Sequence, residues 1–399
     1  MVLVSVYREA FRGLPREVWL LSAAALINRA GTMVLPFLSL YLDEQLGFSK
    51  QTTGMLILAF GLGSVVGSYL GGWASERLGP VRVQELSLLA GGSALMGLGR
   101  LETLPMLWVG LFVAAALGDA FRPALMAACA DATAPESRTR ALALVRLAIN
   151  LGMGIGPAVG GLLAARNYQL LFLVDGLTCW AGAAMLWWTV GRIERRQRKE
   201  ESAAAPEPMA AVWRDWPFMT FLALVFLLGL SFFQIFFTLP LYYHEVYGLS
   251  ERTIGLAMSL NALVIVLVEM PLVRALERWN HLLVFGAGAL LVGLGIGVLP
   301  LGRHLSLVIA STLVWTLGEM LSLPFSNGLV AARAGSGTSS RHMGMYSMTF
   351  SVAFVVAPPL GLAAYGAWGG DTLCLAIAGL GMVVLAGTLA LRSFYGVHG

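Results

Sequence analysis

Charged side chains inside apolar stretches are the positions where this chain could do chemistry. Seven of them stand deep within long apolar runs of the 399-residue sequence: Arg29, Asp119, Arg122, Arg146, Asp175, Glu269 and Glu319. Burying a charge in such surroundings costs about 3 kcal/mol, so these residues are expected to bind a proton, an ion or a charged ligand.

Glu319 is the sharpest candidate for a proton-binding group. The chain after residue 216 has no deep basic residue to neutralise it, and an apolar setting favours the neutral carboxyl, so the group could exchange a proton near neutral pH. A structural acid held by hydrogen bonds is the alternative.

Asp119 occupies the corresponding place in the first half, because Leu117-Gly118-Asp119 matches Leu317-Gly318-Glu319. Asp119 and Arg122 stand three residues apart, so on a helix they share a face and can pair. Two interpretations remain open: a proton-binding acid tuned by Arg122, or a permanent structural ion pair.

The other deep charges are less specific. Arg29, beside Asn28, could complete a charge network or hold an anionic group of a substrate. Glu269 and Arg146 lie nearer one membrane face and can extend toward it. Asp175 has no partner recognisable from the sequence.

The elements that must position these residues are membrane-spanning helices. Apolar residues make up 58% of the chain, charged residues only 12%, and the mean hydropathy is +0.77, which excludes an ordinary soluble protein. About 20 apolar residues span a bilayer. Twelve segments meet that length, and they predict an all-α integral membrane protein: 17–42, 52–75, 83–100, 104–130, 140–165, 168–191, 217–243, 253–276, 281–301, 304–332, 342–366 and 371–392.

The gap at 192–216 is charged and then rich in Ala and Pro, as a solvated linker would be. It separates an expected six-helix bundle at 1–191 from a second at 217–399. If both termini are cytoplasmic, 18 Lys and Arg residues fall on that side and five on the other. Basic residues favour the cytoplasmic face, so we expect a multi-pass plasma-membrane protein, in a bacterial inner membrane, with both termini inside.

An internal repeat relates the two halves. YLDEQLGFSKQTTG from Tyr41 aligns with YYHEVYGLSERTIG from Tyr242, an offset of 201 residues that also relates Arg140 to Arg341 and Pro157 to Pro358. An even number of spans per half makes the repeats parallel, with a substrate path expected between them near the midplane.

Two motifs within this arrangement resemble the major facilitator superfamily. Between the second and third spans, GGWASERLGPVR resembles the family's loop motif, with Glu in place of the usual Asp. The residues that match are Gly72, Glu76, Arg77, Gly79 and Arg82. The resemblance implies two pseudo-symmetric six-helix bundles and a gating ion pair in this loop; a charge cluster that sets topology is the alternative.

The second motif, GMGIGPAVGG in segment 140–165, resembles the antiporter signature of the drug–proton exporters in that superfamily. It matches at Gly152, Gly156, Pro157, Gly160 and Gly161. The resemblance implies export, whereas close helix packing through small residues is the alternative.

Polar and aromatic residues in the spans could line a substrate cavity. The candidates are Asn28, Gln234, Phe236, Asn261, Trp315, Asn327 and Tyr346. For most of the aromatic residues, a place facing lipid or the membrane interface is the stronger alternative.

Other classes of function find no support. Cys129, Cys179 and Cys374 lack metal-ligand or disulfide spacing, and no phosphate-binding loop or catalytic motif appears. We therefore expect a monomeric transporter, not an enzyme, with a small-molecule substrate, no nucleic-acid partner, no metal and no cofactor beyond protons. Proton-coupled export of small amphipathic molecules by alternating access is the expected function, and an uptake symporter or facilitator for a sugar, peptide or other metabolite is the alternative.

Overall fold

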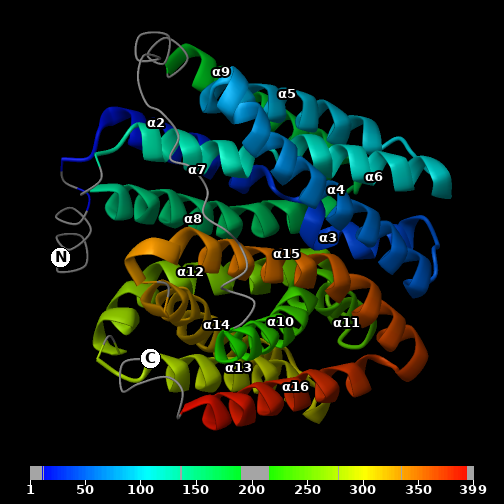
Figure 1. Ribbon diagram of the computed structural model, residues 1–399. Coiled ribbons are helices and arrows are strands. Elements are labelled where there is room, and N and C mark those ends of the chain that lie inside the picture. The colour runs from blue at the N-terminus through cyan, green and yellow to red at the C-terminus, as the bar shows by residue number, and fades with distance from the viewer. Residues whose placement is uncertain are drawn as a thin grey trace. The chain divides into compact units, whose positions relative to one another are not determined.

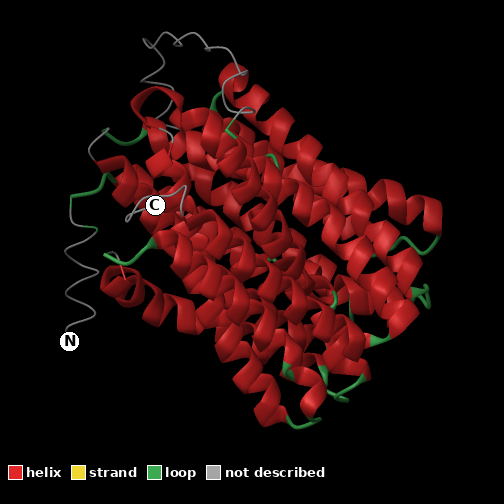
Figure 2. Cartoon of the chain, turned by 60° about the horizontal axis from the view of Figure 1, so that its bottom comes forward, coloured by secondary structure: helices red, strands yellow, loops and turns green. Residues whose placement is uncertain are grey.

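The computed structural model describes residues 11, 13–134, 137–189, 215–276, 278–333 and 335–392. Within these residues every regular element is a helix, and the segments between helices are short loops (Figure 2). The expected linker at 192–216 lies almost entirely outside the described residues. The all-helical membrane fold predicted from composition is therefore confirmed.

Among the described residues of the first half, nine helical segments form the six predicted spans (Figure 1). They are α2 (Arg16–Gly31), α3 (Val34–Leu40), a π-helical segment (Tyr41–Gln45), α4 (Lys50–Leu78), α5 (Pro80–Leu98), α6 (Leu104–Gly118), α7 (Phe121–Asp131), α8 (Arg138–Ala164) and α9 (Gln169–Thr189). The first span is thus divided after Gly31, and the fourth is divided at Asp119 and Ala120.

In the described part of the second half, eight helical segments form the spans. They are α10 (Trp216–Phe237), α11 (Leu239–Glu245), α12 (Glu251–Leu276), α13 (His281–Gly297), a short 3-10 helix (Leu299–Leu301), α14 (Leu305–Arg333), α15 (Gly335–Trp368) and α16 (Gly370–Leu391). The seventh span is divided at Thr238, whereas α14 and α15 stay continuous through Pro324 and through Pro358 and Pro359.

Eleven helices among the described residues are long and apolar enough to cross a membrane, one fewer than expected. The difference is α5, whose first turns contain Arg82, Gln84 and Glu85. These residues lower the hydropathy of a 19-residue helix that has little apolar length to spare.

The chain divides into two compact units, Met1–Phe37 with Ala59–Glu201, and Leu38–Leu58 with Ser202–Gly399. The segment 38–58 was assigned from sequence to the first bundle, but its contacts place it with the second unit. Gly54 shows why: a Cβ atom there would meet Pro359 Cα at 3.0 Å.

The sequence repeat is preserved in backbone conformation. Gly47 and Gly248, 201 residues apart, have φ angles of 69° and 65°, a left-handed conformation that glycine adopts without strain. After each glycine the next N–H returns to the preceding helix, Phe48 to Leu42 and Leu249 to Tyr243, both at 3.1 Å. The aligned sequences therefore build the same helix-ending turn.

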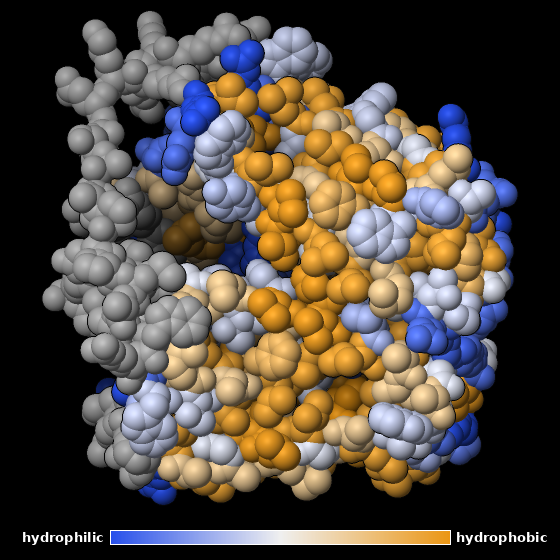
Figure 3. Space-filling view, turned by 45° about the vertical axis from the view of Figure 1, so that its right-hand side comes forward, coloured by the Kyte–Doolittle hydropathy of each residue, from blue (hydrophilic) through white to orange (hydrophobic). Residues whose placement is uncertain are grey.

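Large apolar side chains cover much of the surface. The face in Figure 3 is mostly hydrophobic, with hydrophilic residues gathered toward its edges. Tyr69, Trp188 and Leu301 are 75%, 74% and 80% exposed, far beyond what a soluble monomer displays as a continuous surface. Such a surface suits contact with lipid.

Candidate functional site

Glu319 and Asn261, two residues selected independently from the sequence, meet in the second unit. Asn261 on α12 donates a hydrogen bond from Nδ2 to Glu319 Oε2 on α14 at 2.9 Å, and another to Thr316 Oγ1 at 3.1 Å. Asn261 and Glu319 are both half-buried. The structure therefore places a carboxyl group in a membrane-spanning helix with a polar partner on the neighbouring helix.

Thr316 determines which end of the Asn261 amide faces the carboxyl group. The Thr316 hydroxyl donates its hydrogen to Thr312 O at 2.5 Å, so it can only accept from Asn261. The amide must then present its NH₂ group, and both N–H bonds are used, one on Thr316 and one on Glu319.

Asp119 and Arg122 do not form the pair allowed by their spacing. In the described structure no ion pair within 4 Å joins them, because the span is interrupted at Asp119, which ends α6 rather than continuing one helix into α7. Arg122 does lie close enough to interact electrostatically with Asp119 and, more strongly, with Arg29 of α2. Asp119 is half-buried and Arg122 exposed.

Asp175, which had no partner in sequence, contacts the break in the first span. One carboxylate oxygen accepts the backbone N–H groups of Met33 at 3.2 Å and Val34 at 3.3 Å. Asn28 approaches the same region, donating from Nδ2 to Cys179 Sγ at 3.6 Å. Asn28 therefore packs between helices of the first unit.

The antiporter-motif glycines of α8 contact this same break. A Cβ atom at Gly152 would meet Arg29 Cβ at 2.6 Å, one at Gly156 would meet Thr32 O at 2.9 Å, and one at Gly160 would meet Met33 Cβ at 3.1 Å. Gly161 and Pro157 are buried, and α8 continues through Pro157 without interruption. The motif thus allows α8 to approach the divided span at backbone distance.

The loop motif joins α4 to α5. Gly79 has a φ angle of 89° and precedes Pro80, the first residue of α5, so a left-handed glycine and a proline set the turn. Arg77 lies over the Trp73 ring at 4.2 Å, and Glu76 and Arg82 are exposed. A Cβ atom at Gly72 would meet nothing within 4 Å, whereas one at Gly71 would meet Ala120 Cα at 2.6 Å.

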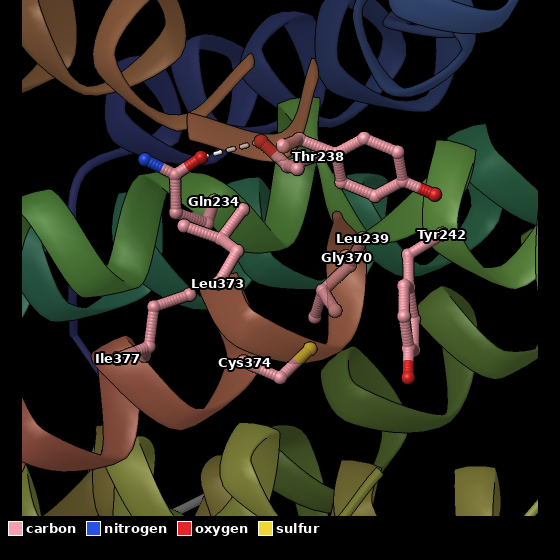
Figure 4. A pocket seen from close by; sticks show the side chains of 9 residues that line it. Gln234, Thr238, Leu239, Tyr242, Gly370, Leu373, Cys374 and Ile377 are labelled. Atoms are coloured by element: carbon pink, nitrogen blue, oxygen red, sulfur yellow. Dashed lines mark hydrogen bonds between the residues drawn. The ribbon is translucent and has the colours of Figure 1, made fainter. Parts of the chain in front are cut away.

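Gln234 holds two helices together. Its side-chain amide nitrogen, Nε2, donates to Ala357 O of α15 at 2.8 Å, and the Thr238 hydroxyl donates to its Oε1. Figure 4 shows this pair at one side of a small cavity, whose lining also includes Tyr242 and Cys374. The Gln234 amide occupies the space that a side chain at Gly361 would need. Gln234 is therefore part of the helix packing within the second unit.

The remaining cavity candidates divide between buried and accessible positions. Trp315 is 3% exposed and packs against Gly295, and Tyr346 is 6% exposed with its hydroxyl 2.7 Å from Ser326 Oγ. Asn327 is half-buried and donates to Leu323 O of its own helix at 2.9 Å. Phe236 is half-buried against Phe232. Of the two other deep charges, Glu269 is half-buried and Arg146 exposed.

Sequence reasoning missed a charged cluster that links segment 38–58 to the second half. Lys50 Nζ lies 2.5 Å from Glu245 Oε1 and 3.8 Å from Asp43 Oδ2, and the Tyr365 hydroxyl donates to Glu245 Oε2 at 2.6 Å. Oxygens of Asp43, Glu44 and Glu245 lie within 4.8 Å of one another, and the Lys50 ammonium offsets their charge. The only signal in the sequence was the repeat match of Glu44 with Glu245.

A second missed ion pair connects the start of α10 to the end of α14. Arg333 binds the Asp215 carboxylate through Nε and Nη2, both at 2.7 Å, while Asp215 also accepts the Phe218 N–H at 3.3 Å. The Arg333 hydrogen bonds lower the pKa of Asp215 below its usual 3.8, although partial burial opposes them.

Comparison with known proteins identifies the family. The model of the Major Facilitator Superfamily matches residues 19–341 and 247–396. A Na(+), Li(+), K(+)/H(+) antiporter of Planococcus maritimus is 22% identical over 364 residues, which cover 83% of this chain and 85% of that protein. Multidrug resistance protein MdtH of Yersinia pestis is 25% identical, covering 78% of this chain and 77% of its own.

Solved structures show the same fold. A peptide transporter POT, in complex with sulfate, superimposes with a TM-score of 0.79 at 16% identity, covering 98% of this chain and 97% of that one. The family model spans nearly the whole chain, both relatives are transporters or resistance proteins, and the helices have the expected order. The chain is therefore a transporter of the major facilitator superfamily and not an enzyme.

Proposed function

We propose that this protein exports small amphipathic molecules in exchange for protons, with Glu319 as the principal proton-binding group. The observation that carries the proposal is the Asn261–Glu319 hydrogen bond between α12 and α14. A carboxyl group in a membrane span that changes its bonding to a neighbouring helix on protonation can couple proton uptake to helix movement. The antiporter motif on α8 and the resemblance to MdtH support export.

The proposed cycle uses the two states of this carboxyl group. Ionised Glu319 accepts a charge-assisted hydrogen bond from Asn261, and protonation from outside reduces it to a weaker neutral one. Loosening of the α12–α14 contact discharges substrate outside and lets the protonated transporter return to the inward-facing state, with Asp119 as a second proton-binding group in the first half. Loss of the proton to the cytoplasm restores the charge-assisted bond and resets the transporter.

Exchange of a monovalent cation for protons is a second candidate. Its support is the Planococcus relative, whose name gives Na⁺, Li⁺ and K⁺ as its cations. Both candidates require a proton-binding acid, and they differ in what moves the other way.

The test uses purified protein in vesicles that contain a pH-sensitive dye. Under an imposed proton gradient, adding ethidium as an amphipathic probe should move protons in the exporter, whereas NaCl or KCl should move them in a cation exchanger. Glu319→Gln should abolish the coupled signal and leave probe binding measurable. Glu102→Gln, an exposed loop acid, is the matched control and should behave as the unsubstituted protein.

Two results would contradict the proposal. Proton movement that responds to none of the probes would exclude antiport with these classes of molecule. Coupling that survives Glu319→Gln would remove Glu319 from the mechanism, even if transport itself were confirmed.

A further inference from the structure

The break in the first span creates backbone groups that the membrane cannot satisfy. The α-helix ends at Gly31, the Thr32 N–H returns to Arg29 O at 3.1 Å, and a new helix begins at Val34. A break of this kind leaves N–H groups without helical acceptors. In the apolar part of a bilayer each such group must find a partner inside the protein.

Asp175 of α9 supplies that partner. Its Oδ2 accepts the N–H groups of both Met33 and Val34, and the residue is 4% exposed. Its other oxygen, Oδ1, lies 3.9 Å from Cys179 Sγ. One carboxylate oxygen therefore accepts from two consecutive backbone N–H groups at the point where α2 has ended and α3 begins.

Neighbouring helices pack against the break on two sides. The backbone therefore cannot easily shift to find other hydrogen-bond acceptors if Asp175 is removed. A Cβ atom at Gly31 would lie 1.8 Å from Thr178 Oγ1 of α9, and one at Gly156 of α8 would lie 2.9 Å from Thr32 O. Neighbouring helices thus touch the backbone of the break directly. Sterics fix its position, and Asp175 satisfies its hydrogen bonds.

Among the described residues, few charged groups act on Asp175. Arg29, in the last turn of α2, and Cys179 of α9 act on it electrostatically. On α8, Arg146 and Arg140 precede Gly156, which contacts the break, by about 15 Å and about 24 Å of helix at 1.5 Å per residue. In α5, Glu85 stands two turns before Gly92, the residue that contacts Gly176.

We propose that Asp175 is a positioning residue for transport: its ionised carboxylate holds the break between α2 and α3 closed, and its protonation loosens the break. The step is the binding of one proton from water to one carboxylate oxygen. A neutral acid accepts from the two N–H groups less strongly than a carboxylate. The link to transport rests on the proposed proton coupling, while the local response does not.

Protonation would also change the surroundings of Arg29. Arg29 interacts attractively with Asp175 and lies near enough to Arg122 to repel it. Neutralising Asp175 removes the attraction and leaves the repulsion, so the end of α2 that carries Arg29 should shift together with the loosened break. Asp175 would thus act through Arg29 and the backbone rather than by touching substrate.

Hydrogen–deuterium exchange of the backbone amides tests this directly, without substrate or gradient. After correction for intrinsic rates, exchange in a peptide containing Met33 and Val34 should rise about tenfold as the pH falls from 8 to 5, the difference between a charge-assisted and a neutral hydrogen bond. The break at Thr238 is the internal control. Its N–H bonds to Gln234 O at 2.9 Å and involves no carboxylate, so it should not respond.

Substitutions at Asp175 distinguish the effect of its charge from the effect of its shape. Asp175→Asn keeps an oxygen that can accept both N–H groups but has no charge, so the pH response at the break should disappear. Asp175→Glu should keep a response with a displaced midpoint. Glu319→Gln should abolish coupled export and leave the response at the break intact, so that failure of either proposal can be recognised separately.

The proposal is overturned if the break in the unsubstituted protein shows no pH response beyond that of the Thr238 segment. It is also overturned if Asp175→Asn keeps the full response, because another group would then be titrating. If Asp175→Asn fails to fold, an unchanged midpoint of the pH response in Asp175→Glu would also overturn the proposal.

Discussion

At the scale of single residues, hydrogen bonds decide which acids in the spans can respond to protons. Glu319 has an amide donor on another helix, and Asp175 has two backbone donors. In the described structure the Asp119 side chain makes no ion pair within 4 Å and no hydrogen bond, and Asp119 ends a helix. These three acids have different partners, so substitution should affect each of them differently.

Removing the donor to Glu319 should shift the pH dependence of transport. Asn261→Ala deletes the bond that stabilises the ionised carboxylate, a loss of about 1 kcal/mol or more, so protonation should occur at higher pH. We expect the midpoint of the rate against pH to rise by roughly one unit. Asn167→Ala, which removes only the exposed bond to the Gln169 N–H, should leave the midpoint unchanged.

The Asp215–Arg333 pair should stabilise the protein only where Asp215 is ionised. Because the pKa of Asp215 is lowered below 3.8 in the folded protein, its contribution is complete above about pH 4 and is lost as the pH falls through the lowered value. Asp215→Asn should therefore lower the melting temperature at pH 7, with a deficit that shrinks below pH 4. A deficit that stays constant down to pH 3 would contradict the assignment.

At the scale of elements, glycines determine how closely α8 meets the divided first span. Gly156→Ala would force a Cβ atom against the backbone at Thr32, which typically costs 1–3 kcal/mol. The melting temperature of the purified protein should fall, and transport should fall with it.

Gly72→Ala is the matched control, because nothing lies within 4 Å of the added Cβ atom. Alanine favours a helix by up to about 1 kcal/mol over glycine, so this variant should be as stable as the unsubstituted protein or more so. Equal losses for the two variants would mean that the contact at Gly156 is not what the motif requires.

The ion pair between Lys50 and Glu245 should stabilise the folded protein, because both side chains are only about a quarter exposed. Lys50→Glu adds a fourth acid to Asp43, Glu44 and Glu245 and should lower the melting temperature. Adding Glu245→Lys should recover most of the loss, with a coupling energy of roughly 1 kcal/mol. Additive losses in the double variant would show that the pair is not coupled.

At the scale of the whole molecule, the distribution of basic residues predicts that both termini face the cytoplasm. A green fluorescent protein fused to the C-terminus should fluoresce, and alkaline phosphatase fused at the same point should be inactive. An active phosphatase fusion would reverse the topology and, with it, the direction of the proposed proton movement.

The sequence by itself determined the fold class, the repeat and two of the polar residues that meet. Twelve apolar stretches and an offset of 201 residues are properties of local composition, which a bilayer converts directly into helices. Eleven of those helices meet the length and hydropathy of a span, and the repeat reappears in the paired turns at Gly47 and Gly248. Glu319 and Asn261 were both recognisable, because polar residues are rare in apolar spans.

Only the tertiary structure decided how the polar groups are partnered. Spacing within one helix allowed a pair between Asp119 and Arg122, but the helix ends at Asp119 and no ion pair within 4 Å joins them in the described structure. Asp175 had no partner in sequence because its partners are backbone N–H groups more than 140 residues away. Backbone N–H groups in a span become available as donors to a side chain only where the helix breaks. Where it breaks, and which side chain reaches it, depends on the packing of α2, α8 and α9 together.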